Sequence, residues 1–363
     1  MFRQVFVQRP FCTAILMQSV MRRTVFGTLA GVLVLVVSVA ATEGQIFSLA
    51  ASSIRALKDS TTSTLFDGDR IHALDVVMPF SVLAAGDIAD CKNGGGLDRA
   101  ARNLRYSLGL KRSKAVPNDG MLDTVRILET YPDAPILALG DLVYKRGEPV
   151  GFADCYDRYW GVAKNRTWPT PGNHEYQSPF AYGYFDYWQE RAGPDRQGYY
   201  ALDAGRWLIL SLNSEIDASP TSQQGDWIGT MLDAYPDRCI AAFYHKPAYS
   251  TVARDNAENA GHLFRQLAEA GVIFVLNGHN HFYERTHPLN GEGVRSDPGT
   301  VTFVAGAGGR TTSGGIAPAR FSDRVVTSTA GVLKLDFFDE AVSWTYLTGA
   351  SATVSDSGTL PCR

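Results

Sequence analysis

Short apolar runs alternate with polar loops and amphipathic stretches from about residue 76 onward. The apolar runs cover residues 81–85, 135–139, 207–212, 240–244 and 272–276. Between them, apolar side chains recur at helical spacing in residues 121–130, 223–234 and 256–270. Because buried strands that alternate with amphipathic helices are typical of βαβ units, the pattern predicts a mainly buried sheet covered by helices.

The pattern changes toward the C-terminus. Residues 300–305, 332–338 and 341–347 are rich in β-forming side chains and are joined by turns or loops. We expect them to be antiparallel strands that complete a second sheet, which makes the fold class an α/β sandwich. Residues 76–350 then form one folded domain, preceded by a linker or edge segment (42–75) and followed by a C-terminal tail (351–363).

The first 41 residues have the profile of a secretory signal. Arg22 and Arg23 precede an apolar stretch centred on residues 32–37, and the small residues Ser38 and Ala40 follow it. This stretch is shorter than the ~20 apolar residues that a transmembrane helix needs. We therefore expect residues 1–41 to be a leader peptide and the protein to be secreted or extracytoplasmic. An uncleaved N-terminal membrane anchor is the alternative.

Cysteine usage agrees with export, because disulfides persist outside the cytosol. Beyond the leader stand Cys91, Cys155, Cys239 and Cys362, which allow three connectivities that sequence alone does not decide. We favour Cys91–Cys155, which flanks two polar loops, and Cys239–Cys362, which would hold the C-terminal tail. Four reduced, buried thiols are the alternative. A metal site built from these cysteines is not expected, because no two form a Cys-x-x-Cys pair.

Composition adds one constraint on partners. The chain has 363 residues, 45% of them hydrophobic, so it can bury a substantial core. Its net charge of −3 is close to balance. Nucleic-acid-binding proteins normally carry a basic excess, so no nucleic acid is expected as a partner.

Residues that bind metals directly follow four of these apolar runs and one short Trp-Pro segment, residues 167–171. Gly-Asp follows residues 81–85 and again residues 135–139, Gly-Asn-His-Glu follows 167–171, a histidine follows 240–244, and His-Asn-His follows 272–276 after Asn-Gly. The candidates are Asp87, Asp141, Tyr144, Asn173, His174, His245, His279 and His281. Ligands of α/β sheets gather outside the carboxyl ends of strands, so we expect these loops to converge on one rim.

Each candidate alone has an ordinary structural explanation. Asp87 by itself would be a helix cap or a turn residue, and His245 a hydrogen-bonded structural histidine. His279 and His281 could share one face of a strand. The whole set favours a metal site, because four of the seven histidines follow segment ends beside two Gly-Asp pairs.

The mixture of ligand types indicates which metals fit. Carboxylate, imidazole and amide groups together suit iron, zinc or manganese, whereas calcium binds oxygen alone. Two such ions ~3.5–4 Å apart need a shared carboxylate between them. A pair of this kind clamps a phosphate and lowers the pKa of a bound water, so the sequence indicates two-metal phosphate chemistry.

The ordered motifs GDIAD, GDLVY, GNHE, FYHKP and GHNHFYER resemble those of the calcineurin-like metallophosphoesterases and, within them, the purple acid phosphatases. The motifs span roughly residues 80–350. The five-motif pattern is specific for the superfamily, while Tyr144 and the His-x-His-x-Tyr-Glu ending narrow it to the purple acid branch. The resemblance implies a four-layer α/β sandwich of two mixed β-sheets flanked by helices, with residues 76–350 as the catalytic domain.

The resemblance also implies the ligands of a first metal. Asp87, Tyr144 and His281 would hold a ferric ion, with Asp141 as the carboxylate that bridges it to the second metal. A phenol becomes a good anionic ligand only beside a strongly Lewis-acidic ion, which supports Tyr144 in this role. A tyrosine that only packs on a loop is the alternative.

The second metal would be iron, zinc or manganese, held by Asp141, Asn173, His245 and His279. In the same family pattern, His174 contacts the substrate phosphate and protonates the leaving group. It is therefore the first of two catalytic candidates.

The second catalytic candidate, Arg254, marks a departure from the family. Many relatives carry another histidine nine positions after the motif histidine, where this chain has Arg254. A guanidinium matches two phosphate oxygens but does not donate a proton, so Arg254 is a candidate phosphate anchor only. A solvated loop arginine is the alternative.

The predicted activity is hydrolysis of phosphate monoesters by a metal-activated hydroxide, of the acid phosphatase type. Its partners would be small phosphorylated substrates, and a membrane only if the N-terminal segment stays uncleaved. A metal-dependent phosphodiesterase on the same fold is one alternative. A non-catalytic surface protein on this scaffold is another, and it would predict lost ligands, whereas all seven are present.

Overall fold

The computed structural model describes residues 70–92, 96–110, 115–252 and 258–363. The expected leader, residues 42–69 and Arg254 lie outside these ranges. Among the described helices, none combines the length and apolar character needed to cross a bilayer.

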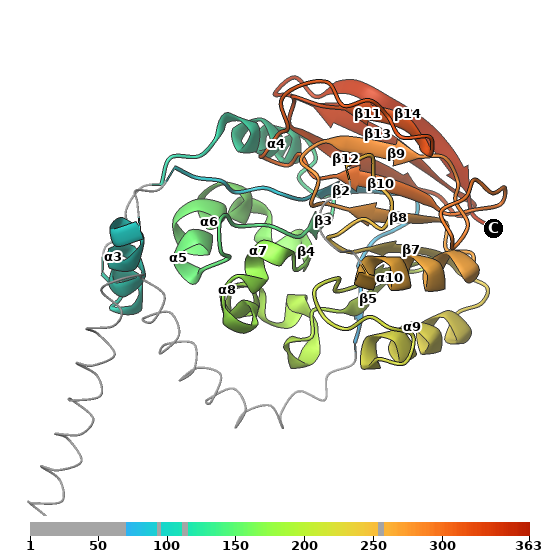
Figure 1. Cartoon of the computed structure of the whole chain (residues 1–363), viewed down its shortest axis with the longest axis horizontal. Coiled ribbons are helices and arrows are strands. Elements are labelled where there is room, and N and C mark those ends of the chain that lie inside the picture. The colour runs from blue at the N-terminus through green and yellow to red at the C-terminus, as the bar shows by residue number, and fades with distance from the viewer. Residues whose placement is uncertain (1–69, 93–95, 111–114, 253–257) are drawn as a thin grey trace, which may run out of the picture.

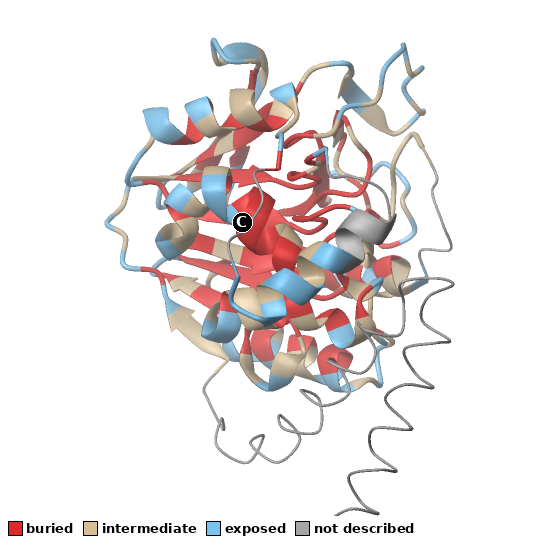
Figure 2. Ribbon diagram, turned by 90° about the vertical axis from the view of Figure 1, so that its left-hand side faces the viewer, coloured by how far each residue is buried: buried red, intermediate tan, exposed pale blue. Residues whose placement is uncertain are grey.

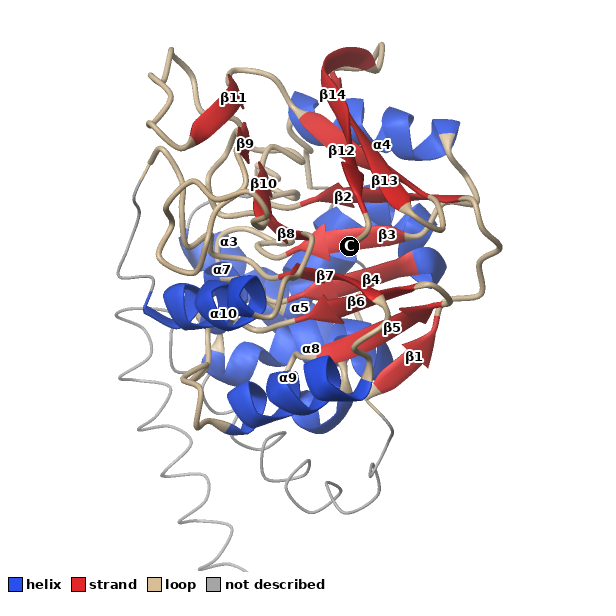
Figure 3. Cartoon of the chain, turned by 90° about the vertical axis from the view of Figure 1, so that its right-hand side faces the viewer, coloured by secondary structure: helices blue, strands red, loops and turns tan. Residues whose placement is uncertain are grey.

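An eight-stranded mixed sheet forms one half of the centre of the molecule (Figure 3). Its strand order is β1-β5-β6-β7-β8-β10-β9-β11. The strands are β1 (Ile71–Ala73), β5 (Tyr200–Ala204), β6 (Trp207–Ser211), β7 (Cys239–Phe243), β8 (Phe274–Asn277), β9 (Tyr283–Thr286), β10 (Val301–Ala305) and β11 (Ser322–Val326).

A six-stranded mixed sheet forms the other half, in the order β14-β13-β12-β2-β3-β4. Its strands are β2 (Phe80–Ala85), β3 (Ile136–Leu139), β4 (Thr167–Thr170), β12 (Gly331–Phe337), β13 (Ala341–Thr348) and β14 (Thr353–Pro361). Within it β2, β3 and β4 run parallel, so their carboxyl ends lie at one edge. In the other sheet β6, β7 and β8 are likewise parallel to one another.

The two sheets pack against each other because their strands are apolar on both faces. Val82 and Ala84 of β2 lie in the core between the sheets, together with Trp207 of β6. Leu83 and Ala85 point the other way, into a second core beneath the helices. Successive side chains of a strand face opposite sides, so one short run supplies both cores. Figure 2 shows buried residues concentrated in the strands.

Helices cover the outer face of each sheet, which gives four layers (Figure 1). The six-stranded sheet is covered by α4 (Asp119–Thr130), α5 (Pro149–Gly151), α6 (Asp157–Tyr159), α7 (Asn173–Tyr176) and α8 (Tyr182–Trp188). Short turns join or extend these helices: η2 (Phe152–Tyr156), η3 (Trp160–Arg166), η4 (Pro179–Ala181), η5 (Gln189–Ala192) and η6 (Pro194–Arg196). The eight-stranded sheet is covered by α9 (Gln223–Ala234) and α10 (Glu258–Glu269). The four-layer sandwich of two mixed sheets is therefore confirmed.

The five predicted apolar strands are confirmed as β2, β3, β6, β7 and β8, and the three helices as α4, α9 and α10. Two C-terminal predictions were wrong. Residues 300–305 contain β10, which pairs antiparallel with β9 as expected but parallel with β8, and it lies inside the eight-stranded sheet instead of completing the second sheet. Residues 351–363 are no tail, since β14 pairs antiparallel with β13 at the edge of the six-stranded sheet. The polar, largely exposed side chains of β14 suit an edge strand and concealed it in the sequence.

Both favoured disulfides are confirmed. Cys91 and Cys155 join the loop after β2 to η2, with their Cα atoms 6.0 Å apart. Cys239 and Cys362 join the start of β7 to the residue after β14, at 5.5 Å. The second bond closes a separation of 123 residues.

Replacing Cys362 by serine is expected to lower the free energy of unfolding by about 2–5 kcal/mol. The reason is that loss of this long cross-link increases the conformational freedom of the unfolded chain. Urea unfolding of the variant and the parent protein, both kept oxidised, measures the difference. Equal midpoints and slopes would show that the bond contributes no stability.

Candidate metal centre

The loops after five strands meet at one rim of the two sheets. Asp87 follows β2, Asp141 and Tyr144 follow β3, and Asn173 follows β4. The loops after β7 and β8 belong to the other sheet and bring His245 and the pair His279 and His281. Backbone bonds join loops across the rim, including Asp87 N–H to Gly140 O at 3.0 Å and Gly278 N–H to His245 O at 2.9 Å.

Three side chains gather around the phenol of Tyr144. Its hydroxyl oxygen lies 2.6 Å from Asp87 Oδ1, 3.1 Å from Asp141 Oδ2 and 3.1 Å from His281 Nε2. His281 Nε2 also lies 3.3 Å from Asp87 Oδ1. We call these four residues the tyrosine group.

Asn173 is at the centre of a second group. Its Oδ1 atom lies 3.2 Å from His245 Nε2 and 3.0 Å from His279 Nδ1. The two imidazole rings face each other edge to face, 5.1 Å apart. His245 Nε2 is also 3.3 Å from Asp141 Oδ2. We call Asn173, His245, His279 and Asp141 the asparagine group.

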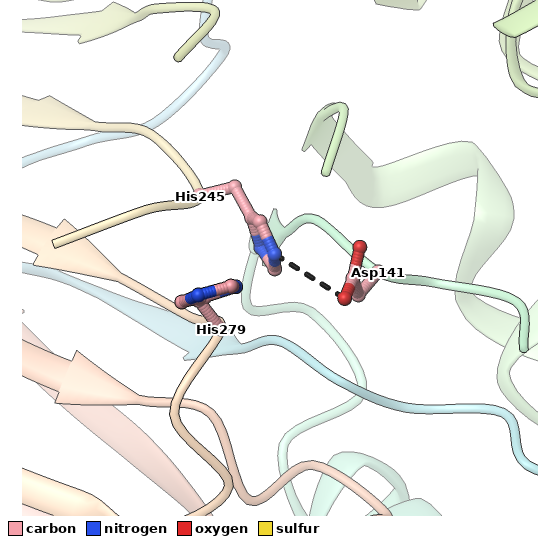
Figure 4. A group of neighbouring side chains, drawn as sticks. All are labelled: Asp141, His245 and His279. Atoms are coloured by element: carbon pink, nitrogen blue, oxygen red, sulfur yellow. Dashed lines mark ion pairs between the residues drawn. The ribbon is translucent and has the colours of Figure 1, made fainter. Parts of the chain in front are cut away.

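One oxygen atom belongs to both groups. Asp141 Oδ2 lies 3.1 Å from the Tyr144 hydroxyl and 3.3 Å from His245 Nε2. Figure 4 shows Asp141 approaching His245, with His279 beside them. The donor atoms that Asp141, His245 and His279 offer all lie within 4.8 Å of one another.

The backbone at three of these residues is in the left-handed region. Asp87, Asp141 and His279 have φ of 59°, 51° and 70°, and each directly follows a glycine. Residues other than glycine seldom adopt this conformation, and strain of this kind clusters at functional sites. It turns each side chain toward the rim immediately after its strand or loop.

Hydrogen bonds fix which atoms face the centre. His245 Nδ1 donates to Leu139 O at 2.8 Å, which leaves Nε2 directed at Asp141 and Asn173. The backbone N–H of His279 donates to Asp87 Oδ2 at 2.7 Å. These bonds occupy His245 Nδ1 and Asp87 Oδ2, and they leave His245 Nε2 and Asp87 Oδ1 available to a ligand.

No model of a known protein family matches the chain. Among curated proteins, the chain is 29% identical over 228 residues to an uncharacterized protein of Mycobacterium tuberculosis, covering 48% of this chain and 42% of that protein. It is 30% identical over 184 residues to purple acid phosphatase 18 of Arabidopsis thaliana, covering 44% and 42%. The chain thus spans about two fifths of the length of these relatives.

Solved structures resemble it over most of its length. Purple acid phosphatase PPD1 from yellow lupin seeds superposes with a TM-score of 0.59 at 17% identity, over 78% of this chain and 54% of the lupin chain. PhoD gives 0.54 at 11% identity, over 79% and 70%. GAP50, the anchor in the inner membrane complex of Plasmodium, gives 0.55 at 10% identity, over 78% and 89%.

The fold is that of a calcineurin-like phosphoesterase of the purple acid phosphatase type. The resemblance found in the five motifs is thereby confirmed.

Within this purple acid phosphatase fold, the ionisable groups at the rim are strongly coupled. Burial opposes the charge on Asp141, yet contact with His245 holds the pKa of Asp141 well below its usual range. Burial also opposes the charge on His245, but Asp141 raises the pKa of His245 to about 10. Burial, followed by the charge on His245, lowers the pKa of His279 to about 4.

A tyrosine binds a metal as a phenolate, but the surroundings of Tyr144 favour its neutral phenol. Burial, followed by the charges on Asp141 and Asp87, raises the pKa of Tyr144 well above its ordinary value. The Arg310 guanidinium lies over the Tyr144 ring, and its charge opposes this shift without reversing it. A strongly charged cation bound beside the two carboxylates would favour the phenolate form of Tyr144.

The residues of both groups fit metal ions. Two ligand atoms bound ~2.1 Å from one ion at right angles are about 3 Å apart. The contacts within each group that involve a ring nitrogen measure 3.0–3.3 Å, which is this spacing. The carboxylate, phenol, amide and imidazole donors are also those that iron, zinc and manganese accept.

His174 is placed differently from the other candidates. Its side chain is 23% exposed, whereas those of His245 and Asp87 are fully buried. His174 Nδ1 donates to Lys145 O at 2.5 Å, and Nε2 faces Asp141 Oδ2 at 3.7 Å. It therefore lies at the solvent side of the cluster, where a substrate would enter. Arg254, the other catalytic candidate, lies outside the described residues.

Sequence reasoning overlooked Glu175, the last residue of the GNHE motif. Its buried carboxylate accepts backbone N–H bonds from Asp141 (2.9 Å), Leu142 (2.9 Å), Val143 (3.3 Å) and Gly172 (2.8 Å). Burial, followed by the charge on Asp141, raises the pKa of Glu175 to about 8, and the N–H donors act against this shift. Glu175 thus fixes the loop that carries Asp141 and Tyr144. Its place beside a motif histidine was the only signal in the sequence.

Arg310 was also overlooked. Its guanidinium carbon lies 4.3 Å from the centre of the Tyr144 ring, and Nη1 lies 3.5 Å from Asp90. The chain brings it there through a backbone bond from Arg310 N–H to Asp87 O at 2.9 Å. No sequence pattern around Arg310 indicates this contact.

Replacing Glu175 by glutamine is expected to lower the free energy of unfolding by about 2–4 kcal/mol. One amide oxygen cannot serve four buried N–H groups, and the new NH₂ group has no acceptor in that place. Thermal or urea unfolding gives the loss. The exposed Glu258→Gln variant on α10 is the control, expected to be within about 0.5 kcal/mol of the parent. A Glu175→Gln protein as stable as this control would exclude the loop-fixing role.

Proposed function

We propose that this chain is a dinuclear-metal phosphatase of the acid phosphatase type, which hydrolyses phosphate monoesters. The observation that supports it most is the position of Asp141 Oδ2, in contact with both the tyrosine group and the asparagine group. A carboxylate shared between two ligand sets is what a pair of close cations requires.

The tyrosine group would hold a ferric ion, through Asp87, Tyr144 and His281. The asparagine group would hold iron, zinc or manganese, through Asn173, His245 and His279. Asp141 would bind both ions. Bound there, the two ions would supply a hydroxide nucleophile at moderate pH and offset negative charge on the phosphoryl group.

His174 would be the catalytic acid. It is the most exposed histidine of the cluster, and the bond from Nδ1 to Lys145 O leaves Nε2 as the atom that faces the site. A proton delivered from Nε2 to the leaving oxygen would complete the ester cleavage. Arg254 as a phosphate anchor stays a prediction from the sequence.

We also propose that the protein is exported to an oxidising compartment. Cys91–Cys155 and Cys239–Cys362 are both paired, and disulfides of this kind persist outside the cytosol. Under this proposal residues 1–41 form the leader, and small phosphorylated molecules are the substrates.

A pair of substrates tests the proposal against a phosphodiesterase on the same fold. We expect purified, metal-loaded protein to hydrolyse p-nitrophenyl phosphate with a kcat/KM at least about 10-fold higher than that for bis(p-nitrophenyl) phosphate. The reverse ratio would assign the site to diesters. Negligible turnover of both by protein with two bound metals would indicate a non-catalytic protein.

A further inference from the structure

Between β2 and β3 the chain contains a long connecting segment, and the two ends of this segment are held together. Lys92 and Val116 form an antiparallel bridge, with Lys92 N–H donating to Val116 O at 2.8 Å. The Cys91–Cys155 disulfide fixes the same point to η2. The described part of this segment contains α3 (Gly96–Ser107), which lies beside α5 at the periphery of the molecule (Figure 1).

The solvent-facing side of this helix carries exposed leucines. Leu104 and Leu108 are 52% and 63% exposed, and Leu110 just beyond them is 53% exposed. Leu108 N–H still donates to Leu104 O at 3.0 Å, so the helical turn continues through it and the two leucines share one face. Three exposed leucines within seven residues form a patch, whereas the other large exposed hydrophobic side chains described are scattered along the chain.

Basic residues accompany the leucines. Residues 92–114 contain seven lysines and arginines and one aspartate, within a chain whose net charge is −3. Arg105 is exposed beside Leu104, and Arg102 is half-buried on the side of the helix opposite Leu104. An exposed apolar face with Arg105 beside it distinguishes this helix from α9 and α10, whose apolar residues pack on the sheet.

We propose that α3 docks the protein on an anionic lipid surface, with Leu104 and Leu108 in the headgroup region and Arg105 near lipid phosphates. Basic amphipathic helices with exposed apolar side chains bind such surfaces through both kinds of contact. A second copy of the chain would bring two strongly basic segments together, which repel each other. A nucleic acid would contact the arginines but leave the leucines in water.

This inference does not depend on the proposed phosphatase activity. It concerns attachment to a surface, and no residue of the metal cluster takes part. Turnover of p-nitrophenyl phosphate in solution is expected to be the same for the parent protein and for α3 variants.

Vesicle binding of the full chain tests the proposal. Co-sedimentation is measured with vesicles of phosphatidylcholine alone and with vesicles that also contain phosphatidylserine. We expect binding to need phosphatidylserine, to weaken about 10-fold or more in Leu104→Gln/Leu108→Gln and to weaken about 5-fold in Arg105→Gln. Val294→Gln, an exposed loop valine, and Arg126→Gln, an exposed arginine on α4, are the matched controls and should bind like the parent.

A local measurement separates α3 from any contribution of the N-terminal segment, which is common to all variants. Amide hydrogen exchange of α3 should slow when phosphatidylserine vesicles are added and stay unchanged with phosphatidylcholine alone. Unchanged exchange in α3 on fully bound protein would overturn the proposal. So would leucine variants that bind like the parent, because contact would then be electrostatic only. Duplex DNA that binds the chain with the same arginine dependence and protects α3 would assign the patch to nucleic acid instead.

Discussion

Replacing Asp141 by asparagine is expected to lower kcat/KM for p-nitrophenyl phosphate roughly 10³-fold or more, which is about 4 kcal/mol. Asp141 Oδ2 is in contact with side chains of both ligand groups, so the substitution affects both proposed metals. An amide lacks the negative charge and presents NH₂ on one side, so it cannot bridge two cations. Metal analysis of the same protein should find at most one ion per chain.

Asp90→Asn is the matched control for this experiment. Asp90 lies three residues after Asp87 and pairs with Arg310 at 3.5 Å, outside both ligand groups. Its variant should keep two metals and lose little activity. An Asp141→Asn protein that keeps two metals and near-parental turnover would show that Asp141 does not bridge.

Replacing His174 by alanine is expected to lower kcat about 10²–10⁴-fold while both metals stay bound. His174 lies at the exposed edge of the cluster, with Nε2 3.7 Å from Asp141 Oδ2, and belongs to neither ligand group. If it protonates the leaving oxygen, the loss should be larger for an alkyl phosphate than for p-nitrophenyl phosphate. The reason is that p-nitrophenolate leaves without needing a proton.

His262→Ala serves as the control for His174. His262 lies on α10 and its imidazole faces Glu258 at 3.8 Å, away from the cluster. Its variant should match the parent with both substrates. Equal losses for the alkyl and the nitrophenyl ester in His174→Ala would exclude leaving-group protonation and leave only a phosphate-binding role.

Much of the site could be predicted because its residues follow strand ends. Asp87 and Asp141 come directly after apolar runs and a glycine, and parallel strands place such positions at one rim. The same rule holds for the other sheet, because His245 and His279 follow the parallel strands β7 and β8 and lie at that rim. The resemblance of the motifs then supplied roles that spacing alone does not give.

Other features depend on contacts that no local pattern records. Glu175 is defined by four N–H groups from two loops, and three of these donors lie more than thirty residues away. β4 contains Pro169 and was not among the predicted strands, although at the edge of a sheet a strand tolerates proline. β10 pairs with β8 in the eight-stranded sheet, and nothing in the sequence of β10 itself indicates this partner.

Metal analysis combined with a visible spectrum tests the central claim most directly. We expect the purified parent protein to carry two metal ions per chain, at least one of them iron, and to show a purple charge-transfer band from the Tyr144 phenolate. Tyr144→Phe should lose this band, because it lacks the oxygen that lies 2.6 Å from Asp87 and 3.1 Å from His281. A parent protein without two bound metals, or a Tyr144→Phe protein with an unchanged band, would contradict the proposed two-metal centre and its tyrosine ligand, respectively.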